Sequence, residues 1–339
     1  MKSSTETFTA ESVPMLYREA LNLALDYAME HDQRVVVLGE DVGFYGGNYK
    51  VTDGLYVKYG PKRVIDTPIA ENSIVGTAIG MALMGLRPVA EIMTANFSML
   101  AMDQIVNQMA KLRYMSGGKL ILPLVVRMPQ GVAKQLAAQH SQSLEHLYAS
   151  VPGIYVMCAS DSITAFHALL YAIKMDDPVI FLEHVLLYGM DFPFEYLEGF
   201  DPFRARVLKE GKDITVVSYL KMVHDVLQAC SWLEEKDGIS CEVIDLVSLR
   251  PIDFETIYKS VKKTKRLAVV YEAPKTLGLG TEVSARVAEE LFYFLDAPPL
   301  RIAGEEVPIP YNRKLELLAI PTSERIYHQL LSWSKNHGL

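Results

Sequence analysis

One carboxylate in this sequence stands where acid–base chemistry is favoured, and it is Glu71. It follows Asp66-Thr67-Pro68-Ile69-Ala70 and begins a segment with no further charge until Arg87. The apolar residues of that segment leave hardly any polar face, which predicts a buried helix that starts after Pro68. Two interpretations of Glu71 are open. It is either an acid stabilised by the helix dipole, or a carboxylate whose pKa is raised by desolvation and that shares a proton with a ligand.

Two glycines, Gly76 and Gly80, lie one turn apart inside the predicted helix. Because each glycine costs a helix about 1 kcal/mol relative to alanine, the pair indicates that another backbone or a ligand comes close on that side.

A second candidate is His140, which Gln139, Ser141 and Gln142 surround in a predicted long loop, residues 128–143. Loops at strand ends often carry function. A lone loop histidine is about as often a structural residue, because histidine changes partners readily. For His140, too, the residues alone leave both interpretations open.

These candidates lie in an alternation of predicted strands and helices that is typical of a doubly wound α/β layer. Ligands of such sheets bind at the carboxyl ends of the strands, where Glu40, Glu71, the segment of Phe97 and the loop with His140 are expected to gather. The predicted strands are residues 34–39, 64–66, 87–92, 122–127, 154–157 and 178–182, and the other predicted helices are 15–31, 103–114 and 162–175.

The pattern restarts after residues 188–204, a segment rich in Gly, Pro, Phe and acids that is predicted to be a linker. Strands are predicted at 214–218, 241–244 and 267–271, and helices at 222–236, 254–261, 281–295 and 323–334. The sequence therefore predicts two doubly wound α/β/α domains, residues 14–190 and 205–335.

The composition of the chain argues against several function classes. Its 339 residues carry a net charge of -8 and no Lys/Arg stripe, so a nucleic-acid binder is not expected. No apolar run reaches the ~18–20 residues needed to cross a bilayer, and the start of the chain is not a secretory signal. Three cysteines inside apolar segments fit a reducing compartment. We expect a cytoplasmic protein.

Common catalytic motifs are missing from the sequence. Gly278-Leu279-Gly280 lacks the third glycine of a dinucleotide loop. There is no Gly-Lys-Ser/Thr phosphate loop, no metal-ligand spacing among the histidines and no Gly-x-Ser-x-Gly elbow.

Several motifs, in order over residues 15–330, resemble the beta subunits of the thiamine-diphosphate-dependent 2-oxoacid dehydrogenase family, most closely the members that act on pyruvate. Thr77 stands where the family's pyrimidine-binding signature has an apolar residue, and Met128 replaces its usual Gly before Pro129. The matching motifs are residues 39–43, 63–72, 85–88, 113–118, 138–142, 249–251 and 307–310.

The resemblance implies an N-terminal thiamine pyrimidine-binding domain and a C-terminal domain like that of transketolase. It implies that Glu71 hydrogen bonds to the aminopyrimidine ring of thiamine diphosphate, that Glu40 and Ile69 line this site, and that Phe97 packs against the ring. It also implies that His140 holds the substrate carboxylate or the reaction intermediate and assists acyl transfer to a lipoyl group. Glu71 and His140 are thus the implied catalytic residues.

The resemblance also implies partners. The sequence has no Gly-Asp-Gly motif for magnesium and diphosphate, so an alpha subunit is expected to hold them in an α2β2 heterotetramer that docks on a dihydrolipoamide acetyltransferase core. Family members bind potassium through backbone carbonyls. The corresponding residues are Leu124, Ala172, Ile173, Met175 and Asp177.

The function that the resemblance implies is oxidative decarboxylation of pyruvate with transfer of the acetyl group to lipoamide, which feeds acetyl-CoA synthesis. An acetoin or a branched-chain 2-oxoacid dehydrogenase is the alternative within the same mechanism. A non-catalytic assembly subunit is disfavoured because Glu71 and His140 are both present.

Overall fold

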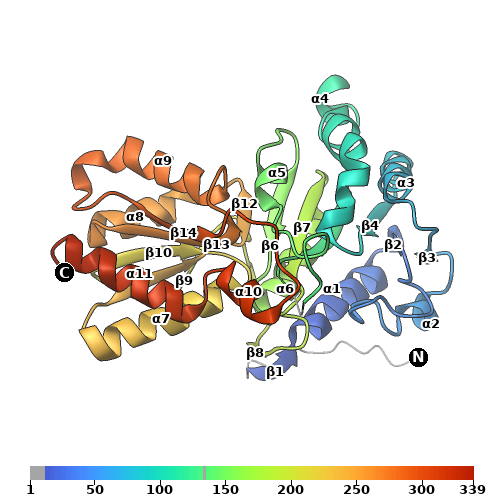
Figure 1. The fold of residues 1–339 in the computed structure, drawn as a ribbon. Helices are drawn as coiled ribbons and strands as arrows, with labels where there is room; N and C mark the ends of the chain where they lie inside the picture. Colours follow the sequence, from blue (N-terminus) through green and yellow to red (C-terminus); the bar gives the residue numbers. More distant parts are fainter. Residues whose placement is uncertain (1–11, 133–134) are drawn as a thin grey trace.

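The computed structural model describes residues 12–132 and 135–339, which form two α/β domains lying side by side (Figure 1). Each domain, called a layer below, is one β-sheet with the helices that cover it. The N-terminal layer is built on a seven-stranded sheet with the order β12-β6-β7-β5-β4-β2-β3. The C-terminal layer is built on a five-stranded sheet with the order β14-β13-β10-β11-β9. The edge strands β12 and β9 run antiparallel to their neighbours, and the other pairs of these two sheets are parallel.

The first half of the chain supplies six strands of the larger sheet and the helices around it. The strands are β2 (Val35–Gly39), β3 (Val64–Asp66), β4 (Arg87–Glu91), β5 (Val125–Gln130), β6 (Tyr155–Cys158) and β7 (Val179–His184). The helices are α1 (Tyr17–His31), α2 (Leu55–Tyr59), α3 (Glu71–Leu83), the 3₁₀ helix η1 (Ala95–Ala101), the π helix η2 (Gln104–Met109), α4 (Leu112–Met115), α5 (Glu145–Ala149) and α6 (Ser162–Lys174). A separate antiparallel pair joins β1 (Val13–Leu16) to β8 (Asp191–Phe194).

The second half of the chain supplies the smaller sheet and returns one strand to the larger one. Its strands are β9 (Arg206–Lys209), β10 (Ile214–Ser218), β11 (Cys241–Asp245), β12 (Ser248–Arg250), β13 (Leu267–Pro274) and β14 (Leu300–Gly304). Its helices are α7 (Met222–Asp237), α8 (Phe254–Thr264), α9 (Leu279–Leu291), the 3₁₀ helix η3 (Phe292–Phe294), α10 (Arg313–Leu318) and α11 (Ser323–Asn336).

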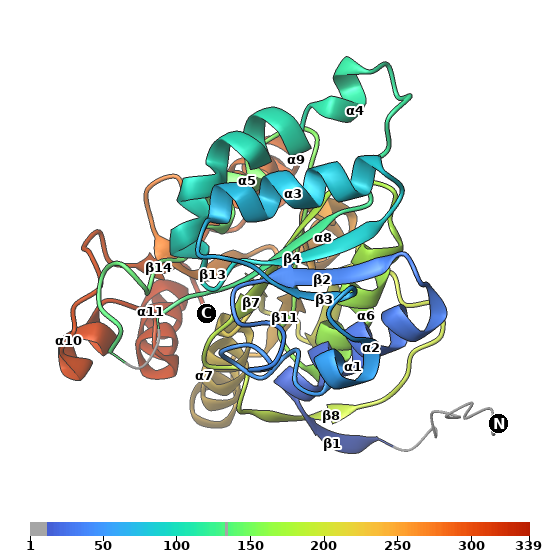
Figure 2. The ribbon, with the colours of Figure 1, turned by 90° about the vertical axis from the view of Figure 1, so that its right-hand side faces the viewer.

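Helices cover both faces of each sheet, which is why most residues of the parallel strands are buried and apolar. In the N-terminal layer, α1 and α6 pack on one face and α3 covers the other (Figure 2). In the C-terminal layer, α7 and α11 pack on one face and α8 and α9 on the other. The buried core beneath α3 continues without interruption into the core beneath α8 and α9, so the two domains are packed as one body.

Most predicted elements are present, with several corrections. The strand predicted at 122–127 is shifted and runs over Val125–Gln130. The helix predicted at 103–114 is divided into η2 and α4. The predicted linker contains β8, and β12 leaves the second half of the chain to pair with β6. The strands β9 and β14 and the short helices α2, α5 and α10 were not expected.

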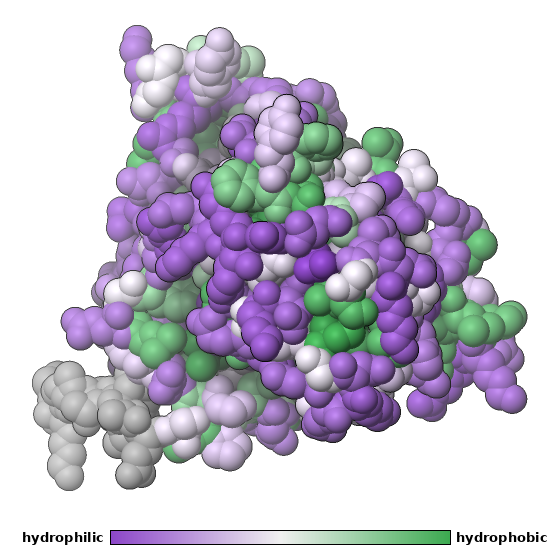
Figure 3. Space-filling model, turned by 90° about the vertical axis from the view of Figure 1, so that its left-hand side faces the viewer, coloured by the Kyte–Doolittle hydropathy of each residue, from purple (hydrophilic) through white to green (hydrophobic). Residues whose placement is uncertain are grey.

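The prediction of a buried helix after Pro68 is wrong for one side of α3. Its buried face includes Ile74, Val75 and Ile79, whereas Asn72 and Thr77 face outward. The absence of charge makes the sequence of this helix resemble a fully buried one, but its exposed side is formed by uncharged residues, most of them small. Figure 3 shows the opposite end of the molecule, where the C-terminal layer presents a mostly hydrophilic face with separate hydrophobic patches.

Candidate functional site

The predicted site residues gather at one edge of the larger sheet. Parallel pairing places Gly39, at the end of β2, opposite both Asp66 of β3 and Glu91 of β4. Glu91 in turn lies opposite Arg127 of β5. Because the carboxyl ends of these strands are aligned, the segments that follow them emerge at the same edge, as in other open α/β sheets.

Glu71 is the first residue of α3, and 7% of it is exposed. In the described part of the chain, no group hydrogen bonds to its carboxylate. Glu40, which follows β2, lies close enough to be affected by it. Burial raises the pKa of Glu40, and the negative charges of Asp41 and Glu71 raise it further. The structure thus brings two of the predicted carboxylates into one electrostatic environment.

His140 and Phe97 are also brought together. Their ring centroids are 5.3 Å apart and the rings are nearly perpendicular, at 79°, a favourable arrangement for aromatic rings. The neighbouring residues bind as well, since Asn96 Nδ2 donates to Gln142 Oε1 at 2.6 Å. The His140 side chain itself is exposed. Ile69 lies just before α3 and is 75% exposed. It therefore presents an apolar side chain at the carboxyl-end edge of the larger sheet.

A buried ionic network joins the central strands β4, β5 and β7, and sequence reasoning missed it. Arg127 donates through Nε to Glu183 Oε1 at 2.7 Å, through Nη2 to Glu183 Oε2 at 2.5 Å, and through Nη1 to Glu91. Burial lowers the pKa of the Arg127 guanidinium, but Glu183 and Glu91 outweigh burial and raise it. Burial raises the pKa of Glu91 despite the attraction of Arg127. Charged residues in otherwise apolar strands were the available signal.

Glu272 of β13 is a second residue that the sequence did not reveal. It is 8% exposed and contacts the segment that leads to His140. Burial opposes ionisation of Glu272, but His184, Ser143 and the amide of Val132 hold its pKa below the ordinary value. The C-terminal domain therefore contributes a carboxylate to the surroundings of the candidate site.

The residues predicted to bind potassium lie in two segments that the fold places side by side. Leu124 immediately precedes β5, and the others lie at the end of α6 and before β7. Arg87 Nη1 donates to the carbonyls of Ile173 and Met175 at 3.2 and 2.8 Å, so a cationic side chain already occupies part of this position. Arg113 forms an ion pair with Asp177. Potassium binding stays a prediction.

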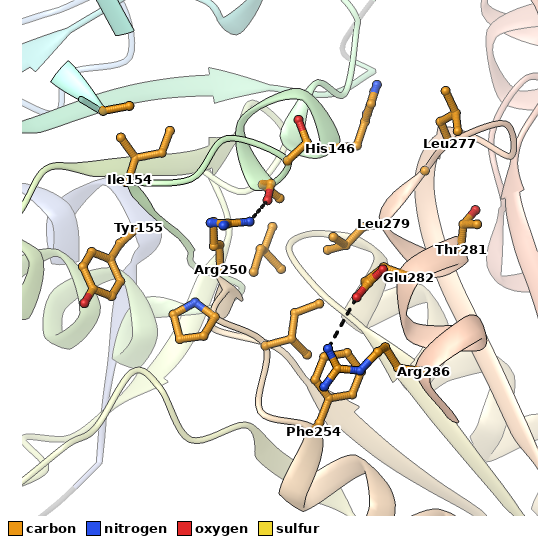
Figure 4. A pocket seen from close by; sticks show the side chains of 18 of the residues that line it. His146, Ile154, Tyr155, Arg250, Phe254, Leu277, Leu279, Thr281, Glu282 and Arg286 are labelled. Atoms are coloured by element: carbon orange, nitrogen blue, oxygen red, sulfur yellow. Dashed lines mark hydrogen bonds and ion pairs between the residues drawn. The ribbon is translucent and has the colours of Figure 1, made fainter. Parts of the chain in front are cut away.

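A cavity of about 1040 Å³ lies between the two layers. Of the predicted site residues, Asp177 alone lines it. Figure 4 shows its labelled residues, including His146, Arg250 and Arg286, which come from α5, from the end of β12 and from α9. Its arginines are engaged within the chain: Arg250 Nη1 donates to the Ala149 carbonyl at 2.6 Å, and Arg286 faces Glu282 at 3.8 Å.

The glycines of the partial dinucleotide motif, Gly278 and Gly280, have a packing explanation. A Cβ on either one would lie 2.3 or 2.1 Å, respectively, from the ring of Tyr271. Tyr271 therefore explains both residues without a bound nucleotide.

The described ranges contain neither a cluster of metal ligands nor a membrane-spanning helix. Within residues 12–132 and 135–339, no three His, Cys, Asp or Glu side chains group closely enough to hold a metal ion. None of the helices described there has both the length and the apolar character needed to span a membrane.

Comparisons with known proteins cover most of the described fold. A model of the family described as "Transketolase, pyrimidine binding domain" matches residues 13–190, and one described as "Transketolase, C-terminal domain" matches residues 204–326. A solved structure, "Split gene transketolase, inactive beta4 tetramer", superimposes with a TM-score of 0.78 at 24% identity over 97% of this chain and 100% of that one. The predicted fold class of two transketolase-like α/β domains is confirmed.

Three similar proteins carry the same designation. The "Pyruvate dehydrogenase E1 component subunit beta" of Porphyra purpurea is 47% identical over 321 residues, 94% of this chain and 95% of the relative. The mitochondrial beta-1 subunit of Arabidopsis thaliana is 47% identical over 329 residues, 95% of this chain and 90% of the relative. The mitochondrial beta subunit of Caenorhabditis elegans is 45% identical over 326 residues, 94% of this chain and 92% of the relative.

Proposed function

We propose a specific catalytic role for this chain, starting from the fact that it belongs to the family of pyruvate dehydrogenase E1 component beta subunits. It is the pyrimidine-binding half of a thiamine-diphosphate-dependent enzyme that oxidatively decarboxylates pyruvate. The acetyl group passes to lipoamide on a dihydrolipoamide acetyltransferase. The observation that carries the proposal is the buried Glu71 carboxylate, which has no hydrogen-bonding partner in the described chain and stands at the start of α3.

Glu71 fits the requirements of the cofactor's aminopyrimidine ring. Glu71 is a buried residue with an unpartnered carboxylate that is available to a ring nitrogen, and a hydrogen bond is stronger where water is largely excluded. Ile69 and Phe97 offer apolar contact to the ring, and Glu40 lies nearby with a raised pKa. When bound, thiamine diphosphate supplies the nucleophilic carbon that decarboxylation of a 2-oxoacid requires.

His140 would act on the substrate and on the transferred acyl group, whereas Glu71 would act on the cofactor ring. It is exposed at the site edge and its ring is held against Phe97, so it can hold the substrate carboxylate and move a proton during acyl transfer. General acid–base assistance of this kind contributes ~10²–10⁴ in rate.

An alpha subunit would complete the site. The sequence has no Gly-Asp-Gly motif for the diphosphate and magnesium. Apolar side chains are exposed at both ends of α3 and on η1, two helices that pack together. Gly80 has nothing within 4 Å of the position a Cβ would take, so a partner helix can approach it closely. The exposed apolar residues are Ile69 (75%), Leu83 (40%), Met84 (85%), Met99 (44%) and Leu100 (68%). An α2β2 heterotetramer is the proposed assembly, and potassium binding and a cytoplasmic location are further parts of the proposal.

The test is co-expression of the chain with its alpha subunit. Purified heterotetramer is assayed with pyruvate, with acetoin and with branched 2-oxoacids, and pyruvate is expected to give the highest kcat/KM. A higher kcat/KM with acetoin or with branched 2-oxoacids would instead assign that activity to the chain. Tight binding of thiamine diphosphate and magnesium by the isolated chain would contradict the shared site.

A further inference from the structure

Two carboxylates of the C-terminal domain hold the segment that carries His140. Glu316 Oε1 accepts from the backbone N–H of Gln135 at 3.0 Å, and Glu272 binds the two ends of the segment. Glu272 Oε1 accepts from the backbone N–H of Val132 at 2.7 Å and from the Ser143 hydroxyl at 2.8 Å. These two donors lie on either side of His140 in the sequence. Glu272 therefore fixes both ends of the same segment at one point.

The other oxygen of Glu272 is held by His184, at the end of β7. His184 Nε2 lies 3.1 Å from Glu272 Oε2. Because His184 Nδ1 accepts from the backbone N–H of Leu186 at 3.2 Å, the ring proton is placed on Nε2, where it is donated to Glu272. His184 is 2% exposed, so this arrangement is shielded from water.

The backbone at Gly131 makes room for the network. Its φ is +97°, a conformation that favours glycine. A Cβ there would lie 2.2 Å from His184 Nε2 and 2.9 Å from Glu272 Oε1. Any side chain at this position would thus collide with the two groups that hold the segment.

Further hydrogen bonds join the two ends of the segment to each other and connect it to the residue beside Phe97. Gly131 N donates to the Gln142 carbonyl at 3.1 Å, and Leu144 N donates to Gln130 Oε1 at 2.9 Å. The Gln142 side chain binds Asn96, next to Phe97. With both ends fixed, the ring of His140 rests against that of Phe97.

We propose that Glu272 is a positioning residue that holds His140 in place for acyl transfer, so that the C-terminal domain takes part in the chemistry of the N-terminal one. The role of His140 rests on the proposed function above. Glu272 itself touches neither substrate nor cofactor in this account. It acts through Val132 and Ser143, and a displacement of about 1 Å at a reacting group can cost ~10²-fold in rate.

The test compares Glu272→Gln, His140→Ala and the double variant in the heterotetramer. In Glu272→Gln the new amide faces the Nε2–H of His184, donor against donor, so at least one contact is lost. Acetylation of a lipoyl domain by pyruvate is measured alongside decarboxylation with an artificial electron acceptor. The expected result is a fall in kcat for acetylation of roughly tenfold to a hundredfold, with a smaller change in decarboxylation.

The double variant separates positioning from general damage. If Glu272 acts through His140, adding Glu272→Gln to His140→Ala lowers the rate no further. An equal fold-loss in both backgrounds would overturn the proposal. Glu255→Gln is the matched control, because Glu255 has a side chain 79% exposed and pairs with Arg204 on the surface.

Two more measurements keep the test decisive. If Glu272→Gln fails to assemble, Ser143→Ala removes one hydrogen bond and is expected to cost about fivefold in acetylation. Amide exchange over residues 135–143 is expected to quicken in either variant, and unchanged exchange would overturn the anchoring role. If His140→Ala retains full activity while exchange still quickens, the assigned role of His140 fails and the anchor stands.

Discussion

Replacing Arg127 by Met should destabilise the chain strongly, because it leaves two carboxylates buried without their cation. Arg127 is 1% exposed, Glu183 is fully buried and Glu91 is 6% exposed. Removing one partner of a buried ion pair typically costs about 3–5 kcal/mol. Since an unfolding entropy of ~2.1 cal/mol/K per residue makes 1 kcal/mol shift the melting temperature of 339 residues by ~1.4 °C, we expect a decrease of about 4–7 °C.

The loss should depend on pH in a defined direction. Without Arg127, no cation opposes the effect of burial on Glu91, so the pKa of Glu91 rises further in the folded state and stability is lost as pH rises above the ordinary pKa of glutamate. Thermal unfolding followed by circular dichroism at pH 5.5 and pH 8 measures this, and the larger decrease is expected at pH 8.

Two controls accompany the measurement of Arg127→Met. The Arg34→Met variant removes a surface pair whose arginine is 58% exposed, and it should cost less than ~1 kcal/mol. Adding Glu91→Gln and Glu183→Gln to Arg127→Met should restore much of the stability by removing both buried charges. A loss below about 1 kcal/mol for Arg127→Met, or one equal at both pH values, would refute the electrostatic reasoning.

Other predictions follow from single positions. Gly131→Ala should displace Glu272 or His184 and lower acetyl transfer about tenfold or more, measured with a lipoyl domain; an unchanged rate would contradict the steric argument. Burial raises the pKa of Asp245 from 3.8 to about 7, although Arg206 opposes this rise. The unfolded carboxyl ionises at lower pH than the folded one, so the wild type should lose stability, on the order of 3–4 kcal/mol, as pH rises from ~4 to ~7. Asp245→Asn should flatten this dependence in denaturant titrations at pH 5 and pH 8, and a slope equal to that of the wild type would count against it.

The local features of the fold could be predicted from the sequence. Apolar runs such as residues 34–39 and 214–218 indicate buried parallel strands, and Pro68 marks the start of α3. Pairings between distant segments could not be predicted in this way. The β1–β8 pair and the return of β12 to β6 depend on contacts over 91 or more positions, as the pairs Leu16–Asp191 and Ser248–Met157 show, and no local pattern encodes such contacts.

The residues of the candidate site also differ in whether local sequence indicates them. Glu71 and His140 stand out because each is a polar residue in an unusual local setting. Glu272 and Arg127 have no such setting, since their partners come from other strands and, for Glu272, from the other domain. Their importance becomes visible only when the strands are brought together in three dimensions.

The measurement that tests the account most directly is the activity of Glu71→Gln in the heterotetramer with thiamine diphosphate and pyruvate. Glutamine keeps the size of the side chain but cannot hold or accept the proton that the carboxylate shares with the ring. The account predicts a loss of kcat of ~10²–10⁴ with an intact heterotetramer. Full activity in this variant would contradict the assignment of Glu71.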